Sequence, residues 1–519
     1  MTLSVELSGA LARSTLAART SVASSGFVSS LLEQDSTLWG PAAQPEAAIR
    51  LGWTVHPATW STVASAVMDL RADLVAAGIS RVVLCGMGGS SLGPEVMAAS
   101  ASLPLTVVDS THPDVISAEL VRDLSDTVIV VSSKSGGTLE TDSQKRAFES
   151  ALRTQGLSPT QHIVIVTDPG SPLHASAVDA GYQVFEGDST IGGRFSAISP
   201  FGLVPFGLAG GDLIGFLEDA ATGFEQCTSP GENNPAVLLG VAVASDNPAV
   251  NKLLLRADPA HPALGNWIEQ LVAESTGKDG VGILPVVESS ITGLPDARSV
   301  GPQGSGSDIE VSGSLAELMV VWEYATAIAC AQIAVNPFDQ PNVESAKVAA
   351  RELLESPQRE NRPEGLLEGL SIFCEPLQPG LQTLSEMPEL LRRLAGARGY
   401  IALCVFAPRD TEERWRRTAH ALELHAGRPV TLGFGPRFLH STGQLHKGGA
   451  PEGVFLQVIE ASATSVAIPG RDFDFGLLLE SQAHGDARVL TETGQPVISL
   501  TGTSDDVERV IATLSSQDG

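Results

Sequence analysis

The sequence predicts an α/β protein with two three-layer α/β/α sandwich domains, mainly parallel sheets and a helical N-terminal extension. Its 519 residues exceed the roughly 100–200 residues of a single domain. From residue 81 onward, short β-branched runs alternate with helical or loop segments, the order expected of parallel sheets with helices on both faces. We expect the extension at residues 1–50, the first domain at 51–215 and the second at 216–519.

The first domain is expected to contain five parallel strands. Each candidate is a short β-branched or apolar run followed by a helical or loop segment, which is the spacing of βαβ units. The predicted strands are 81–85, 105–108, 127–131, 162–166 and 182–185. A segment rich in turn residues, 227–234, separates this part of the chain from the next.

Beyond that segment, helices precede a second group of strands. The apolar stretch 316–335 contains Glu317 and Glu323, so we expect a buried helix there and not a membrane span. The other predicted elements are helices at 235–255 and 264–275, an extended run at 281–287, a Gly/Ser/Pro-rich loop at 301–307, and strands at 400–406, 430–433 and 453–458. The simplest arrangement is a second α/β domain whose sheet is assembled from distant segments.

Charge and cysteine content restrict the function and the compartment. Asp and Glu total 60 against 32 Lys and Arg, giving a formal net charge of −28, so we expect no nucleic-acid partner and no membrane partner. The five cysteines are scattered without CxxC spacing, as reduced, mostly buried thiols of a cytoplasmic protein would be. The histidines lack HxH or HExxH spacing, and we expect neither a metal nor a cofactor.

A glycine-rich loop follows the first predicted strand. Residues 86–93 read GMGGSSLG; the glycines allow close backbone approach to a ligand, and the following helix N-terminus offers N–H groups to an anion. Gly88, Gly89 and Ser90 are the candidate ligand-binding residues. A dinucleotide site is an alternative, because Asp109 ends the next strand about 20 residues on, although Ser91 replaces the third glycine of that fingerprint.

A second loop, rich in hydroxyl groups, follows the third predicted strand at 132–141. Its candidate ligand-binding residues are Ser133, Lys134, Ser135 and Thr138. Hydroxyls and backbone N–H groups suit the terminal oxygens of a phosphomonoester. Two such loops at the carboxyl ends of neighbouring strands indicate one ligand in the crevice between them. The plainer interpretation is that both are ordinary strand-to-helix turns.

Four further segments carry residue types suited to proton transfer. Glu274 lies near the end of a helix, where a carboxylate's ionised form is disfavoured, and Gln270 shares its face. Arg194 follows a Gly–Gly turn in an apolar segment, and Lys347, one of only six lysines, interrupts an apolar helical stripe. The plainer alternatives are a solvated Glu, an Arg paired at the surface and a Lys whose stem extends to solvent. His440 and His446 lie in a Gly-rich connection between two late strands.

These segments resemble known families. The two loops resemble the sugar-isomerase (SIS) domain, and the segments 192–196, 270–278 and 336–347 look like signature segments of phosphoglucose isomerase. The resemblance covers about residues 80–350 in matching order. The segment 439–449 is closer to the isomerase half of bacterial bifunctional transaldolase/phosphoglucose isomerases. The resemblance implies that both sandwich domains are of SIS type.

The resemblance also implies roles. The residues matching the family's catalytic set are Glu274 as the base that moves the proton, Arg194 as stabiliser of the enediolate, and Lys347 in ring opening. The family's histidine lies between its Glu and Lys motifs, but no histidine lies between residues 274 and 347 here. The spacing from Gly433 favours His440 over His446. Gly193 and Gln270 join the loop residues named above as expected substrate-binding positions.

The implied activity is the reversible conversion of glucose 6-phosphate to fructose 6-phosphate in glycolysis and gluconeogenesis, by a homodimer whose sites could be completed across the interface. One alternative is an isomerase that also accepts mannose 6-phosphate. Another is a non-catalytic sugar-phosphate sensor, since SIS domains also occur in regulators. The presence of Glu274, Arg194 and Lys347 together favours an enzyme, because a sensor needs only the phosphate loops.

Overall fold

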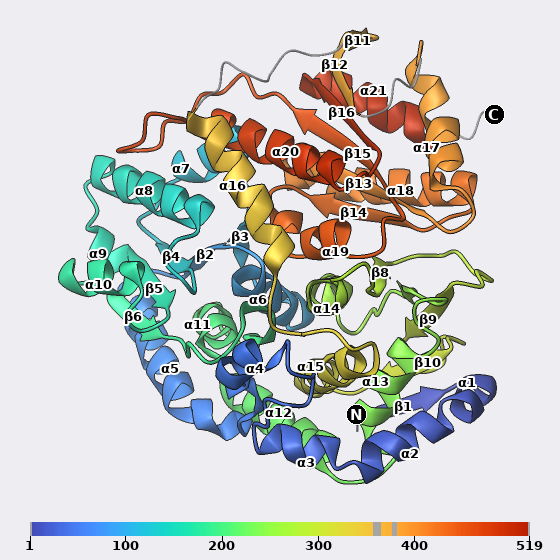
Figure 1. Ribbon diagram of the computed structural model, residues 1–519. Helices are drawn as coiled ribbons and strands as arrows, with labels where there is room; N and C mark the ends of the chain where they lie inside the picture. The colour runs from blue at the N-terminus through green and yellow to red at the C-terminus, as the bar shows by residue number, and fades with distance from the viewer. Residues whose placement is uncertain (1–2, 356–364, 376–380, 517–519) are drawn as a thin grey trace.

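The computed structural model describes residues 3–355, 365–375 and 381–516, and within them the strands form three sheets surrounded by helices (Figure 1). The first sheet is built from residues 81–186 and the second from the C-terminal part. The third joins the N-terminal strand to strands between residues 252 and 312. Most strand pairs are parallel. The predicted α/β class is therefore confirmed.

The first sheet has five parallel strands in the order β3-β2-β4-β5-β6. They are β2 (Arg81–Gly86), β3 (Thr106–Val108), β4 (Thr127–Ser132), β5 (Ile163–Thr167) and β6 (Gln183–Glu186), close to the five predicted ranges. In β4, Val128 and Val130 enter one hydrophobic core, and Ile129 and Val131 enter another. Because both faces are buried under helices, the strands are continuous apolar runs without polar alternation.

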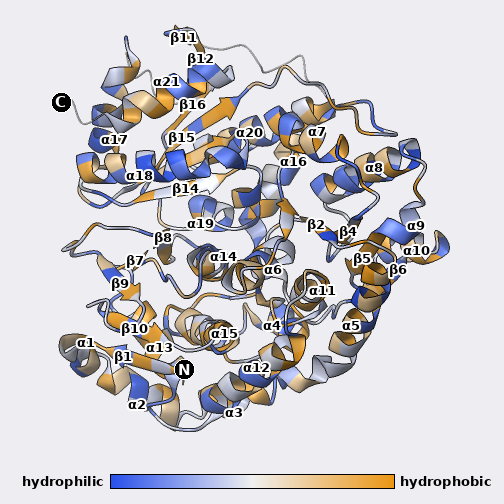
Figure 2. Cartoon of the chain, turned by 180° about the vertical axis from the view of Figure 1, so that it is seen from behind, coloured by the Kyte–Doolittle hydropathy of each residue, from blue (hydrophilic) through white to orange (hydrophobic). Residues whose placement is uncertain are grey.

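The C-terminal sheet has six strands in the order β11-β12-β16-β15-β13-β14. The predicted strands correspond to β13 (Tyr400–Phe406), β14 (Val430–Phe434) and β15 (Gly453–Glu460); β11 (Gly365–Leu367), β12 (Leu370–Glu375) and β16 (Val497–Gly502) were not predicted. Helices α18 (Glu412–Ala426), α20 (Phe475–Glu492) and α21 (Ser504–Ser515) flank it. Figure 2 shows β15 in hydrophobic colours and much of α18 in hydrophilic ones.

The third sheet, β1-β10-β9-β7-β8, corrects one predicted helix. The helix expected over 235–255 ends early: α13 covers Pro235–Ala244, and Lys252–Leu255 form strand β7. Asp246 has a φ of 63° and Pro248 follows, and both residues are incompatible with a continuing helix. The other strands are β1 (Ser4–Leu7), β8 (Leu284–Val287), β9 (Ala297–Gly301) and β10 (Ile309–Ser312). The N-terminal segment thus contributes a strand besides its helices α1–α4 between Gly9 and Arg50.

Three helices position the candidate site. Helix α14 (Leu264–Thr276) matches the predicted 264–275, α15 (Leu315–Gln332) is the expected buried apolar helix, and α16 (Pro341–Glu355) packs along α20 (Figure 1). Ser314 is the N-cap of α15 and forms a capping box with Glu317, in the first turn. Among the described residues, no helix combines the length and apolar character needed to cross a membrane.

Candidate active site

A cavity of about 230 Å³ joins the hydroxyl-rich loop to the C-terminal part of the chain. One wall is formed by the end of that loop and the start of α8 (Leu139–Thr154), and the opposite wall by α16, α20 and the short helix η6 (Arg437–His440). Lys347 and His440 both line it, together with Ser135 and Thr138. Residues that the sequence places more than 200 positions apart therefore surround one small space.

The glycine-rich loop does not line this cavity but packs directly against the catalytic candidates. Gly88 has a φ of 57°, and a Cβ atom there would lie 2.8 Å from the His440 carbonyl oxygen. A Cβ atom on Gly89 would lie only 2.0 Å from the carbonyl oxygen of Gly193. Only glycine permits these approaches, so the two glycine motifs fix the backbones of Arg194 and His440 relative to α6 (Gly89–Ser100).

In the hydroxyl-rich loop, the Ser133 and Thr138 hydroxyls contact each other, whereas the Lys134 side chain is directed to Asp168. Ser133 Oγ donates to Thr138 Oγ1 at 3.3 Å, so these hydroxyls lie together. The Lys134 ammonium instead donates to Asp168 Oδ2 at 2.6 Å and to the Asp188 carbonyl at 2.7 Å. Burial lowers the pKa of Lys134, and Asp168 partly offsets this effect. Lys134 can offer its backbone N–H to a ligand, but its charge is used within the fold.

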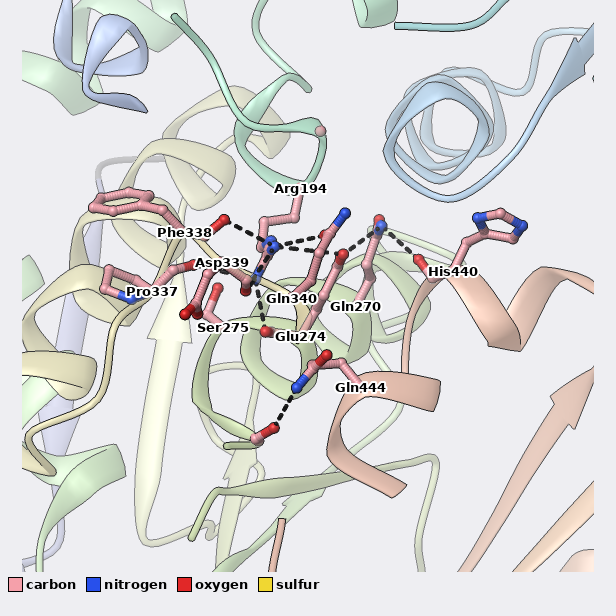
Figure 3. A network of polar contacts seen from close by, with 12 residues as sticks. Arg194, Gln270, Glu274, Ser275, Pro337, Phe338, Asp339, Gln340, His440 and Gln444 are labelled. Carbon is pink, nitrogen blue, oxygen red and sulfur yellow. Dashed lines mark hydrogen bonds and ion pairs between the residues drawn. The ribbon is translucent and has the colours of Figure 1, made fainter. Parts of the chain in front are cut away.

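Glu274 is buried on α14, with 6% of its surface exposed. Gln270, one turn earlier, donates from Nε2 to Glu274 Oε2 at 3.2 Å and also to the His440 carbonyl at 2.9 Å. Arg194 Nη2 lies 3.5 Å from Glu274 Oε1. Figure 3 shows this network, with the His440 ring directed away from Glu274. Glu274 does not line the small cavity; Gln270 connects it to the segment that does.

Arg194 is held inside the protein and not at its surface. Its Nη1 donates to the carbonyl oxygens of Glu274 at 2.6 Å and Pro337 at 3.1 Å, and its Nη2 donates to Gln340 Oε1 at 2.8 Å. Beside it, Lys278 pairs with Asp339 at 2.9 Å. Burial lowers the pKa of Lys278 to about 8, and the charge of Arg194 adds to this effect. The guanidinium is thus oriented by backbone acceptors and by one carboxylate.

The two histidines have opposite surroundings. His440 Nε2 donates to Glu140 Oε1 at 2.9 Å, and 15% of the His440 side chain is exposed. The His446 ring is fully buried and lies 6.0 Å from the Tyr400 ring, and both its nitrogens are without a hydrogen-bond partner among the described residues. Burial, with the neighbouring Lys447 charge, lowers the pKa of His446 to about 3. The His446 ring packs between aromatic rings and does not line the cavity.

Glu140 is a candidate that the sequence analysis did not single out. Burial would raise the pKa of this carboxyl, but the charge and hydrogen bond of His440, together with the charge of Lys347, hold the pKa below its ordinary value. Its position in the first turn of α8 also favours a negative charge. An acidic residue directly after a phosphate-type loop was the signal available in the sequence.

A second cavity, of about 710 Å³, lies between α14 and α18. Its arginines are paired: Arg416 with Glu288 at 2.9 Å, and Arg437 with Asp109 at 2.7 Å. Glu269, on α14, also lines it. Burial raises the pKa of Glu269 to about 8, and the charges of Arg437 and Arg416 only partly offset this effect.

We expect Glu269→Gln to stabilise the protein increasingly as the pH rises from 5 to 8. The folded state holds the Glu269 proton more tightly than the unfolded state, so unfolding releases it and wild-type stability falls between pH 4.5 and about 8. Glu269→Gln has no proton to release at this position, so its stability does not fall for this reason. At pH 8 its free energy of unfolding should exceed that of the wild type by at least about 1 kcal/mol more than at pH 5. Urea unfolding at pH 5, 6.5 and 8 measures it; an advantage that is constant across these pH values would contradict the prediction.

Comparisons with known proteins identify the family. The family model described as phosphoglucose isomerase matches residues 72–293. A glucose-6-phosphate isomerase of Synechococcus sp. (strain JA-2-3B'a(2-13)) is 30% identical over 368 residues, which cover 56% of this chain and 69% of that protein. The chain belongs to the phosphoglucose isomerase family.

Other relatives of this phosphoglucose isomerase family member match a shorter part. A glucose-6-phosphate isomerase of Chlamydia trachomatis serovar D is 40% identical over 179 residues, which cover 32% of this chain and 34% of that protein. The crystal structure of a glucose-6-phosphate isomerase from Chlamydia trachomatis D/UW-3/Cx superposes with a TM-score of 0.50 and 21% identity, covering 61% of this chain and 75% of that one. This likeness supports the fold.

Proposed function

We propose that the protein interconverts glucose 6-phosphate and fructose 6-phosphate by acid–base catalysis. The observation that carries the proposal is the His440–Glu140 pair, 2.9 Å apart, on the wall of a cavity that also contains Lys347 and the hydroxyl-rich loop. Behind this wall lies the buried Glu274, held by Gln270 and Arg194. A sugar-phosphate sensor would need the phosphate-binding loop but would not need Glu274, Gln270 and Arg194.

In the proposed reaction, the phosphate binds to the hydroxyls and backbone N–H groups of the loop 133–138. His440 and Lys347, which line the cavity, move the proton of the ring oxygen and hydroxyl so that the ring opens. The open chain extends past Gln270 to Glu274, which takes the proton from C2 and returns it to C1. Arg194 stabilises the negative charge that develops on the enediolate oxygens.

Gln270 has a linking role in this scheme. Its amide donates both to Glu274 and to the backbone of the His440 segment, at 3.2 and 2.9 Å. The ring-opening and proton-transfer groups are therefore held at a fixed spacing through one side chain. Gly88 packs closely against the backbone of His440, and Gly89 packs closely against the backbone of Gly193 and Arg194. This close packing fixes the positions from which the Arg194 and His440 side chains extend. Ser90, in the first turn of α6, is proposed to offer its backbone N–H to the substrate.

We also propose that the protein acts in the cytoplasm, in glycolysis and gluconeogenesis, as a homodimer. The unpaired thiols of Cys85, Cys227, Cys330 and Cys404 support a reducing compartment. The resemblance to phosphoglucose isomerases supports the homodimer.

The proposed function is tested by incubating the purified protein with fructose 6-phosphate and coupling glucose 6-phosphate formation to its dehydrogenase. We expect turnover, and mannose 6-phosphate supplied in parallel measures tolerance of the C2 epimer. Calorimetric titration with fructose 6-phosphate measures binding separately. Binding without turnover would contradict the isomerase and support the sensor.

A further inference from the structure

We propose that Gln482 and Thr111 are positioning residues that orient the Glu140 carboxylate toward His440. The inference rests on the proposed function, because it assigns a supporting pair to the histidine proposed to open the ring. Gln482 lies on α20, and Thr111 lies in the connection that follows β3. Neither residue belongs to the loops or signature segments described in the sequence.

The contacts form one chain of hydrogen bonds. Thr111 Oγ1 donates to Gln482 Oε1 at 2.7 Å, Gln482 Nε2 donates to Glu140 Oε1 at 2.7 Å, and His440 Nε2 donates to the same oxygen at 2.9 Å. Thr111 is fully buried, and Gln482 and Glu140 are 5% and 6% exposed. The bonds of Gln482 to Thr111 and to Glu140 are buried, so they are stronger than they would be at the surface.

The direction of the Gln482 amide is determined by its two neighbours. With its oxygen toward Thr111, the amide accepts the hydroxyl proton and presents its NH₂ group to Glu140. The opposite orientation would place the amide oxygen against a carboxylate oxygen, which has no proton to donate when ionised. The Thr111 hydroxyl therefore selects the orientation in which Gln482 stabilises the charged form of Glu140.

Charged groups reach Glu140 from two other elements. His440 comes from η6 and Lys347 from α16, and Arg351 of α16 lines the same cavity. The positive charges of His440 and Lys347 favour the ionised form of Glu140. They do not fix the orientation of its carboxylate group, because charge attraction has little directional preference. Gln482 supplies a directional bond to the shared oxygen, and its position on the long helix α20 makes that bond rigid.

The test compares Gln482→Leu and Thr111→Val with the wild type. Loss of the amide donor makes Glu140 easier to protonate, so the acid limb of the kcat profile should move up by about one pH unit in Gln482→Leu. Thr111→Val, which keeps the shape and removes the hydroxyl, should move it in the same direction by less, and Thr111→Ser should restore it. The KM at neutral pH should change less than twofold.

Gln457→Leu is the matched control. Gln457 is also a buried glutamine that donates to a carboxylate, Asp486 at 3.0 Å, but it lies outside the cavity. It should lower thermal stability without moving the acid limb. An unchanged acid limb in folded Gln482→Leu, or an equal movement in Gln457→Leu, would overturn the proposal.

A second measurement separates this proposal from the proposed function. The ¹⁵N resonances of the His440 ring, assigned by their loss in His440→Asn, report Glu140 protonation as an inflection at low pH. That inflection should move up by about one pH unit in Gln482→Leu. A wild type without turnover would contradict the proposed function alone, whereas an unmoved inflection would overturn the role of Gln482.

Discussion

Glu274→Gln is expected to lower kcat for fructose 6-phosphate by about 10³-fold while leaving binding of the sugar phosphate within a fewfold of the wild type. Glutamine has the same shape, and its amide oxygen can still accept the Gln270 hydrogen bond of 3.2 Å. It cannot accept and return a proton. The coupled assay measures the loss, and calorimetric titration measures the binding.

Glu269→Gln is the matched control for that experiment. It makes the same substitution five residues earlier on α14, on a side chain that lines the larger cavity. Its kcat should remain within about twofold of the wild type, in line with the small effects of substitutions that spare special features. Equal losses in both variants would indicate damage to α14 and would contradict a specific role for Glu274.

Lys447→Met should lower the free energy of unfolding by about 3–5 kcal/mol. The Lys447 ammonium and the Asp486 carboxylate form an ion pair whose side chains are 1% and 0% exposed. Removing the cation leaves a buried carboxylate supported by Gln457 Nε2 at 3.0 Å. Urea unfolding at pH 7 measures the change.

The double variant Lys447→Met/Asp486→Leu completes the cycle. Removing both charges leaves an apolar pair, so it should be more stable than Lys447→Met alone. Because Lys447 follows His446 in α19 (Gly443–Gly448), near the proposed active site, activity is measured on each folded variant. A double variant less stable than the single one would contradict the ion-pair explanation.

The strands of the first sheet could be predicted because their apolar runs are buried on both faces. Val128 to Val131, for example, supply both adjoining cores without a polar residue. The third sheet could not be predicted in the same way. Its strands have four or five residues, and β1 pairs with β10 some 300 residues away, Ser4 opposite Ser312. Pairing between such distant segments leaves no local pattern in the sequence. Strand β7 (Lys252–Leu255) closely follows the apolar helix α13, and the predicted helix therefore wrongly extended over it.

For the candidate site, the sequence identified the segments that contribute residues. It did not reveal which partner each side chain contacts. The glycine loops, Glu274, Arg194 and Lys347 carried recognisable motifs, and the preference for His440 stays a prediction that its contact with Glu140 supports. The Lys134 ammonium is directed to Asp168, which no spacing reveals. Gln482 meets Glu140 across 342 residues, a contact that depends on how α20 packs against α8 and α16.

Proton exchange with solvent tests the central claim, that Glu274 moves a proton between C2 and C1, most directly. The wild type and Glu274→Gln are incubated with fructose 6-phosphate in D₂O, and NMR follows deuterium at C1 of the ketose and C2 of the aldose. We predict deuterium at these carbons with the wild type and exchange about 10³-fold slower with the variant. Exchange at the wild-type rate in Glu274→Gln would contradict the account.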